Sequence, residues 1–209
     1  MRGRLLPCEN SRHQTGGRIR MSSEDRSKWN TRYLDGAYES RTHPSALLVE
    51  WQDRLPVGRA LDVACGAGRN SLWLAERGNQ VTAVDISDVA LRRLGDHAGV
   101  GRIETVELDL DQGLSIEGRF DLIIKMRFLS LKLLPTLVDR LDSGGVLVCE
   151  VLLQSGQGDA APAPSSFRAA PGALLATAQG LEIMYYDEGP VMDPDGRTVL
   201  LARLIGRRR

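Results

Sequence analysis

Short apolar runs alternate with amphipathic segments along most of this chain. Runs typical of β-strands lie at 59–64, 80–85, 102–108, 120–126, 144–153, 181–189 and 197–206. Segments with helical spacing of apolar residues lie between several of them, at 70–77, 87–98, 134–141 and 171–180. Near-continuous apolar strands that alternate with helices are typical of a parallel sheet covered on both faces. The pattern therefore predicts an α/β fold with a doubly wound, Rossmann-like, seven-stranded sheet.

Capping residues predict where several helices begin and end. Ser22 or Ser23 would cap a helix at 22–34, and Ser87 would cap another. Gly78 is placed to end the helix at 70–77 in a left-handed conformation. A further helix is expected within 43–56, between two prolines.

The last two strands are expected to form a hairpin. Parallel strands need a crossover of about a dozen residues, usually a helix. The connection "PVMDPDG" at 190–196 is shorter and rich in turn-forming residues. The sheet should therefore be mostly parallel, with an antiparallel C-terminal hairpin.

The composition is that of an ordinary folded protein. Hydrophobic residues make up 42% of the 209 positions and charged residues 26%, which excludes a disordered or fibrous chain. This length suits one α/β domain. No apolar run approaches the about 20 residues that span a bilayer, and no segment resembles a signal peptide. We therefore expect a cytoplasmic protein with no membrane partner.

Charge is distributed unevenly, although the formal net charge is +0. Residues 1–20 carry five arginines and one glutamate, and residues 207–209 are all arginine. Basic tails alone carry no readout chemistry, so a nucleic-acid partner is not expected. Because Met21 resembles a natural start, we expect residues 1–20 to be a disordered extension, 21–206 a single domain and 207–209 a basic tail.

Two further features bear on function. The segment 154–166 is rich in small residues and proline, and could be either a mobile lid or a linker. Three cysteines, Cys8, Cys65 and Cys149, have no ligand spacing, so no metal site is expected. Cys65 is expected to be a small buried residue rather than a reactive thiol.

A glycine turn follows the first strand. In "DVACGAG", Gly66 and Gly68 allow a sharp turn and the close approach of a ligand. The dinucleotide fingerprint would place a third glycine where Ser71 stands. A lone GxG is weak evidence, because tight turns between strands and helices use glycine for structural reasons.

Three aspartates favour a ligand site at this turn, since they lie in or at the ends of three successive strands. Asp62 is placed to bind a ligand ammonium group, and its charge would repel a pyrophosphate. Asp85 can accept hydrogen bonds from both ribose hydroxyls of an adenosine. Asp109 can accept from the adenine amino group while Leu110 packs against the ring. This order of groups suits S-adenosylmethionine (SAM) better than a dinucleotide.

The segment "LDVACGAGRNSLWLAERGNQVTAVD" closely resembles the first motif of class I SAM-dependent methyltransferases. Within it, "CGAGRNSLWLA" resembles the branch of tellurite-resistance and thiopurine methyltransferases. The likeness covers most of residues 29–206. It implies a methyltransferase that uses SAM as cofactor and a small molecule as acceptor, such as a thiol or a selenium or tellurium compound.

The resemblance also implies which residues bind the cofactor. An N-terminal segment would cover it, and Met126 would face its methionine part just past the fourth strand. The matching positions are Tyr38, Arg41, Asp62, Gly66, Gly68, Asp85, Ile86, Asp109, Leu110 and Met126. No catalytic residue is identified.

The chain departs from the branch at two places. A His-Arg pair precedes the last strand in tellurite-resistance enzymes, where Val191 and Met192 stand here, and only Arg197 retains a basic character. This weakens tellurite as acceptor, because an oxyanion favours guanidinium donors. Ser130 replaces a histidine that many members carry, which removes one possible base.

Few other side chains are candidates for the acceptor site. Lys125 and Arg127 could attract an anionic acceptor or be solvated charges at a strand end. Trp29 and Tyr33 could line an acceptor pocket, although aromatic residues at this spacing usually pack against the core. His43, before a proline, favours a capping or packing role.

Methyl transfer from a sulfonium is a direct displacement that requires alignment more than covalent help. The missing base is therefore no argument against activity. Two rival functions stay open: a SAM-binding module without turnover, and a nicotinamide-dependent oxidoreductase, which Asp62, the missing third glycine and the expected hairpin disfavour. A nucleic-acid methyltransferase would carry an "NPPY"-type motif, and "KMRF" stands in its place.

Overall fold

The computed structural model describes residues 16–97, 100–154 and 167–209. The first 15 residues of the predicted extension, and residues 155–166 of the predicted lid or linker, lie outside this description. Residues 16–20 belong to the first helix.

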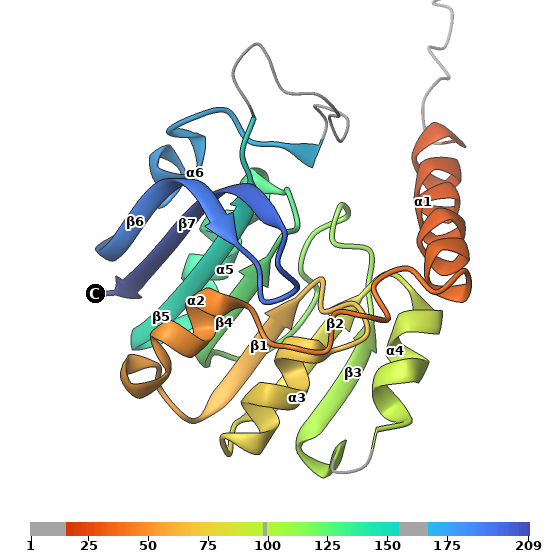
Figure 1. Cartoon of the computed structure of the whole chain (residues 1–209), viewed down its shortest axis with the longest axis horizontal. Helices are drawn as coiled ribbons and strands as arrows, with labels where there is room; N and C mark the ends of the chain where they lie inside the picture. Colours follow the sequence, from red (N-terminus) through yellow and green to blue (C-terminus); the bar gives the residue numbers. More distant parts are fainter. Residues whose placement is uncertain (1–15, 98–99, 155–166) are drawn as a thin grey trace, which may run out of the picture.

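One mixed sheet forms the centre of the molecule (Figure 1). Its strands are β1 (Arg59–Val63), β2 (Gln80–Asp85), β3 (Ile103–Glu107), β4 (Phe120–Met126), β5 (Leu141–Leu152), β6 (Leu181–Met192) and β7 (Thr198–Arg208). The strand order is β3-β2-β1-β4-β5-β7-β6. Strands β1 to β5 are parallel to one another, and β7 is antiparallel to both β5 and β6. The predicted seven-stranded sheet and its antiparallel C-terminal hairpin are confirmed.

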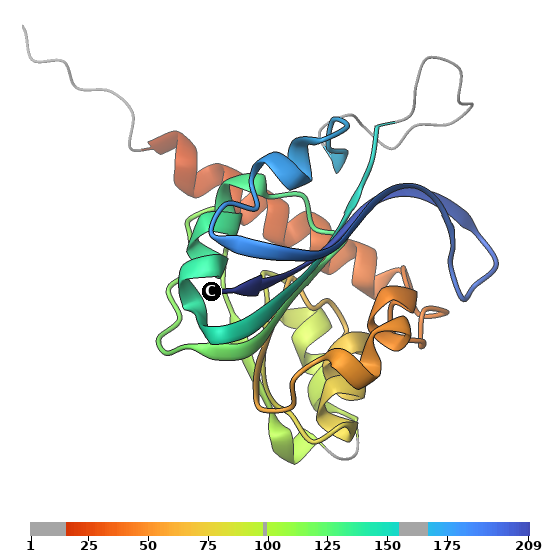
Figure 2. The same ribbon diagram turned by 90° about the vertical axis from the view of Figure 1, so that its left-hand side faces the viewer.

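Helices cover both faces of the sheet (Figures 1 and 2). They are α1 (Gly16–Leu34), α2 (Ala46–Glu50), α3 (Arg69–Glu76), α4 (Asp88–Gly95), α5 (Leu134–Arg140) and α6 (Ala173–Ala176), with 3-10 turns η1 (Gln52–Arg54), η2 (Val100–Arg102) and η3 (Leu131–Leu133). Apolar residues of α2, α3 and α4 pack against one face of the sheet. Those of α5 and α6 pack against the other. This two-sided burial explains why the central strands are almost wholly apolar.

Local sequence accounts for several helix boundaries. Ser87 accepts a hydrogen bond of 3.1 Å from the Ala90 amide and caps α4, and Gly78 follows α3 with a φ of +98°. Two predicted boundaries were wrong. Helix α1 already includes residues 16–21, before the predicted caps Ser22 and Ser23. The helix expected within 43–56 is divided into α2 and η1.

The order in which strands are added to the sheet reverses between β1 and β4. The chain adds β2 and β3 on one side of β1, then crosses to β4 and β5 on the other. In open α/β sheets, ligands bind at such a switch point, outside the carboxyl ends of the strands. Among the described residues, none of the helices has the length and apolarity to cross a membrane. The cytoplasmic location stays a prediction.

Candidate functional site

The glycine turn lies directly at the switch point, between β1 and α3. Gly66 and Gly68 have φ values of +59° and +82°, a region that L side chains rarely adopt. A Cβ at Gly66 would lie 2.4 Å from the hydroxyl of Tyr33, and one at Gly68 would lie 2.3 Å from Leu94. Glycine is therefore required at both positions by the backbone and by the packing of α1 and α4.

Asp62 lies within β1 and is 1% exposed. Its Oδ2 accepts a hydrogen bond of 2.6 Å from the hydroxyl of Ser71 on α3. Burial raises the pKa of Asp62 to about 7, although the hydrogen bond from Ser71 favours the ionised form. A cationic group beside this carboxylate would supply the partner that a buried charge needs.

Asp85 ends β2 and supports the glycine turn. Its Oδ2 accepts from the Gly66 amide at 2.8 Å, and its Oδ1 accepts from the Ser87 amide at 2.9 Å. Burial raises the pKa of Asp85 despite these two bonds. Each carboxylate oxygen can accept a second hydrogen bond, so the ribose contact predicted for Asp85 would add to these amide contacts.

Asp109 follows β3 and carries a buried oxygen without a partner. Its Oδ1 accepts from the Asp111 amide at 2.9 Å. Its Oδ2 has no hydrogen-bond partner among the described residues. An unsatisfied buried acceptor carries a desolvation penalty that a ligand donor would remove. Leu110 beside it is buried, and Ile86 after Asp85 is partly exposed.

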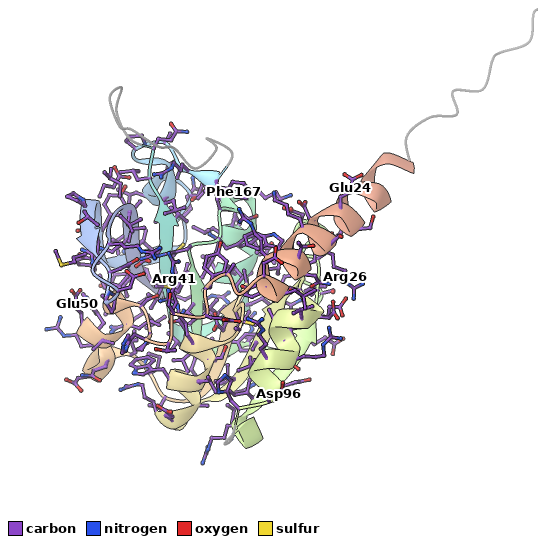
Figure 3. The ribbon with its side chains drawn as sticks, turned by 45° about the vertical axis from the view of Figure 1, so that its right-hand side comes forward. Glu24, Arg26, Arg41, Glu50, Asp96 and Phe167 are labelled. Carbon is purple, nitrogen blue, oxygen red and sulfur yellow. The ribbon has the colours of Figure 1, made fainter. Side chains whose placement is uncertain are left out.

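Helix α1 lies across this edge and docks on α4 (Figure 3). Asn30 donates to Asp88 at 2.7 Å and accepts from the Ser87 hydroxyl at the same distance. Arg26 pairs with Glu107. Tyr33 is buried against α4, and the partly buried Trp29 packs beside it. Both aromatic residues therefore make packing contacts, and a role in an acceptor pocket stays a prediction.

The segment after α1 carries Tyr38 and Arg41. Tyr38 has a φ of +69°, and its ring centroid lies 5.9 Å from that of Tyr33. The Arg41 guanidinium lies 5.2 Å from the Tyr38 ring and 3.8 Å from Asp195 on the β6–β7 hairpin. Both residues thus lie near the glycine turn, at the edge where the cofactor was predicted.

Neither cation at the end of β4 has the role that the sequence indicated. Lys125 is fully buried, donates to the Phe128 carbonyl at 2.5 Å and lies 3.8 Å from Sγ of Cys149. It is neither a solvated charge nor available to an acceptor. Its side chain points into the apolar layer because alternate residues of a strand face opposite sides of the sheet.

Arg127 is also engaged within the protein. Its Nε donates to Glu150 at 2.8 Å, and its two terminal nitrogens bind both oxygens of Asp193, one of them at 2.7 Å. This Arg127 clamp, formed by Arg127, Glu150 and Asp193, ties the end of β4 to β5 and to the β6–β7 hairpin. Met126 before it is the last residue of β4, rather than just past the strand, and is buried.

The remaining positions that the sequence indicated are scattered. Val191 and Met192 end β6, and Met192 is 70% exposed. The hydroxyl of Ser130 is buried and has no hydrogen-bond partner among the described residues. Burial raises the pKa of the Cys65 thiol well above its usual value, so Cys65 is an inert buried residue, as expected.

The residues at the switch point fit SAM. Asp62 offers a buried carboxyl oxygen, and Asp109 offers an unsatisfied acceptor at the third strand end. A dinucleotide pyrophosphate would instead face the carboxylate of Asp62. Sequence reasoning identified these acids, but it missed Ser71 as the donor to Asp62 and Asp193 as the partner of Arg127.

Comparison with known proteins agrees with this arrangement. Residues 60–145 match the family model of a methyltransferase domain. YqeM of Bacillus subtilis (strain 168), assigned as a methyltransferase, is 34% identical over 68 residues. That match covers 32% of this chain and 28% of YqeM.

Solved structures of low sequence identity share the fold. TehB from Haemophilus influenzae superposes with a TM-score of 0.65 at 21% identity, over 85% of this chain and 66% of TehB. Magnesium protoporphyrin IX methyltransferase (ChlM) from Synechocystis PCC 6803, with bound S-adenosylhomocysteine (SAH), superposes with a TM-score of 0.64 at 16% identity, over 90% of this chain and 99% of ChlM. Residues 60–145 therefore match a methyltransferase domain, the chain has the fold of the SAM-dependent methyltransferases, and SAM is the cofactor expected of this chain.

Proposed function

We propose that this protein transfers a methyl group from SAM to a small-molecule acceptor, such as a thiol or a selenium or tellurium compound. The observation that carries the proposal is the unsatisfied Oδ2 of Asp109. It lies at the third of three successive strands whose acids follow the order of ammonium, ribose and adenine. The match of residues 60–145 to the methyltransferase domain supports the same reaction class.

Each acid has a specific role in the proposed site. Asp62 binds the ammonium group of the cofactor, directly or through water. Asp85 accepts from the ribose hydroxyls while it holds the Gly66 and Ser87 amides. Asp109 accepts from the adenine amino group, and Leu110 and Ile86 contact the ring.

The other predicted contacts surround these acids. Gly66 and Gly68 form the turn under the methionine part, and Met126 faces it from the end of β4. Tyr38 and Arg41 cover the cofactor from the segment after α1. Helix α1 shields this edge from water, because Tyr33 and Trp29 close the space between α4 and the glycine turn.

When bound, SAM supplies an activated methyl group for direct displacement by a nucleophile. The contribution of the protein is alignment, which can lower the barrier by about 7 to 11 kcal/mol. A thiolate or a selenium anion arrives deprotonated and needs no base. Lys125 is engaged with Phe128 and Arg127 with two carboxylates, so neither serves as a base in this arrangement.

Calorimetric titration with SAH, followed by methyl transfer from labelled SAM to a panel of thiols and selenium compounds, tests the proposal. We expect the protein to bind SAH, not to bind NADH, and to label at least one acceptor. NADH binding in place of SAH would support the oxidoreductase alternative. SAH binding without any labelling would favour a SAM-binding module, which the Val191 and Met192 departures leave open.

An Asp85→Ala variant adds a site-specific control. It should lose SAH affinity, because its ribose acceptor is gone. Asp85 also holds two backbone amides, so thermal unfolding of the variant has to be followed in parallel. A folded variant that binds SAH as tightly as the wild type would contradict the ribose role.

A further inference from the structure

A small crevice opens where three distant segments meet. The residues after α1 contribute Arg41 and His43, the start of α3 contributes Arg69, and the hairpin turn contributes Asp193 and Asp195. In Figure 2 the tip of the β6–β7 hairpin lies beside the segment that follows α1, and Figure 3 labels Arg41 on that segment.

The crevice borders the proposed site for methyl transfer on two sides. Arg69 directly follows Gly68 of the glycine turn. Asp193 is held by Arg127, which directly follows Met126 at the end of β4. A group bound in the crevice would therefore lie beside the switch point, where the methionine part of the cofactor is expected.

The charges around the crevice do not cancel. The carboxylates of Glu150 and Asp193 are both bound by Arg127. Asp195 lies 3.8 Å from Arg41 and 3.7 Å from Arg197. These three carboxylates face four guanidinium groups, once Arg69 is counted. The buried carboxyl group of Asp62 also interacts with Arg69, but burial raises its pKa to about 7, so the cluster carries a net positive charge while Asp62 is protonated.

Arg69 is the unpaired cation of this cluster. Within the described residues, none of the carboxylates forms an ion pair with it. Its guanidinium donates instead to the His43 carbonyl and to the Ser45 hydroxyl, both at 3.1 Å. Burial and the nearby guanidinium groups of Arg127 and Arg41 lower the pKa of Arg69. A guanidinium group has five N–H donors, so donors remain beyond these two bonds.

The guanidinium of Arg69 is held in place before any ligand binds. Its bonds to residues 43 and 45 fix its direction, and the Ser45 amide donates to Asn70 at 3.0 Å, which pins the same segment to the start of α3. A fixed guanidinium fork loses little conformational entropy when it binds an anionic oxygen group. This arrangement is typical of a recognition site rather than of a solvated surface charge.

We propose that this crevice binds an anionic oxygen group of the methyl acceptor, a carboxylate or a phosphate, with Arg69 as the donor. The inference rests on the proposed function and specifies the class of its acceptor. It replaces the role that the sequence indicated for Lys125 and Arg127. The anionic group would anchor the acceptor while its nucleophilic atom faces the cofactor.

Titration of the SAH-saturated protein with malonate, a dicarboxylate probe, tests this assignment. Malonamide is the neutral control of the same shape. We expect malonate to bind and malonamide not to bind, with malonate affinity falling at least about tenfold in Arg69→Gln, because charged hydrogen bonds are lost. Arg197→Gln removes the same charge from the hairpin turn and should change the affinity less than about twofold.

Arg69→Lys provides a second variant if Arg69→Gln unfolds. It keeps the charge and loses the fork, so it should retain part of the malonate affinity. Equal losses of malonate affinity in Arg69→Gln and Arg197→Gln would show that malonate responds only to long-range electrostatic attraction. That result would overturn the proposed site. Binding of malonate and malonamide with equal affinity would overturn it as well.

A comparison of two cofactor fragments separates the acceptor from the cofactor as the source of the anion. SAH carries the methionine carboxylate, and 5′-methylthioadenosine lacks it. We expect Arg69→Gln to leave the affinity for both unchanged. A selective loss of SAH affinity would assign Arg69 to the cofactor carboxylate and overturn the acceptor role. Wild-type protein that binds malonate but not SAH would instead reject the proposed function.

Discussion

Ser71 donates a hydrogen bond of 2.6 Å to Oδ2 of Asp62, and this pair joins the first helix turn of α3 to β1. Both side chains are buried. Ser71 stands where a dinucleotide fingerprint would place its third glycine. A glycine at position 71 would leave a buried carboxylate without its donor, so the departure from that fingerprint and the acid within β1 have one structural explanation.

Asp62→Asn should stabilise the protein without ligand at pH 8. The folded pKa of Asp62 is raised to about 7 from 3.8. Between these values the folded state holds a proton that the unfolded state releases, so stability falls as pH rises through this window. Ionisation of Asp62 lowers the free energy of unfolding by an amount on the order of 4 kcal/mol at most. Denaturant unfolding at pH 8 and pH 4 measures this free energy for both proteins.

The advantage of Asp62→Asn should shrink toward pH 4, where both forms are neutral when folded. The asparagine oxygen can still accept from Ser71, so the hydrogen bond is retained. A variant less stable than the wild type at pH 8 would show that ionised Asp62 does not destabilise the folded protein.

SAH binding should be coupled to proton release from Asp62. Below pH 7 the free protein holds this carboxyl group protonated, and the ammonium group of the ligand favours its ionised form. Affinity should therefore rise with pH by up to about tenfold per unit below pH 7 and level off above it. Calorimetry at pH 6 in buffers of different ionisation enthalpy counts the protons. The same proton count in Asp62→Asn as in the wild type would exclude this carboxyl group as their source.

Asp109→Ala should weaken the binding of SAH by about 10- to 100-fold, because a hydrogen bond to a charged acceptor is lost. Its thermal stability should fall by no more than about 0.5 to 1.5 kcal/mol, since Oδ2 has no partner among the described residues and only the hydrogen bond from the Asp111 amide to Oδ1 is lost. An inosine analogue of SAH, which has a carbonyl oxygen in place of the adenine amino group, adds specificity. The wild type should discriminate strongly against it and Asp109→Ala only weakly. Equal discrimination by both proteins would rule out the adenine contact.

Gly66→Ala should destabilise the protein by more than the strain of an alanine in a left-handed backbone conformation. Its φ is +59°, and the added Cβ would also lie 2.4 Å from the Tyr33 hydroxyl. Gly144→Ala is a matched control, because it has a φ of +78° and open space around the Cβ. The control should cost about 1 to 2 kcal/mol in the free energy of unfolding, and Gly66→Ala more.

Tyr33→Phe should recover much of the unfolding free energy that Gly66→Ala loses beyond the loss in Gly144→Ala. It removes the clashing oxygen, and the next ring atom would lie 3.5 Å away. A double-mutant cycle of unfolding free energies gives this coupling. Additive effects of the two substitutions would show that the hydroxyl group does not constrain the turn.

Arg127→Leu should destabilise the protein by about 3 to 5 kcal/mol, because it leaves Glu150 buried without a partner. Adding Glu150→Gln should recover part of this loss. Arg26→Ala is the control, since it breaks a half-exposed ion pair with Glu107 and should cost less than about 1 kcal/mol. Chemical denaturation measures the free energy of unfolding of each variant. Similar losses of this free energy in Arg127→Leu and Arg26→Ala would contradict a structural role for the Arg127 clamp.

Sequence reasoning was strongest where structure depends on neighbours along the chain. Ser87 as a helix cap, Gly78 as a helix end and the antiparallel hairpin follow from local backbone chemistry and from the length of a connection. The start of α1 was placed wrongly, because a serine can lie inside a helix as well as cap it. The acids of β1, β2 and β3 were found because parallel strands bring their carboxyl ends to one edge.

The sequence by itself determined the alternation of strands and helices, the glycine turn and its three acids. Only the tertiary structure decided which partners the cationic side chains have. Arg127 binds Asp193, which is 66 residues away along the chain, while Lys125 is buried and Arg69 is left without an ion pair among the described residues. Periodicity records which face a side chain takes, but which charges meet depends on how distant segments pack, so no local pattern could assign these partners.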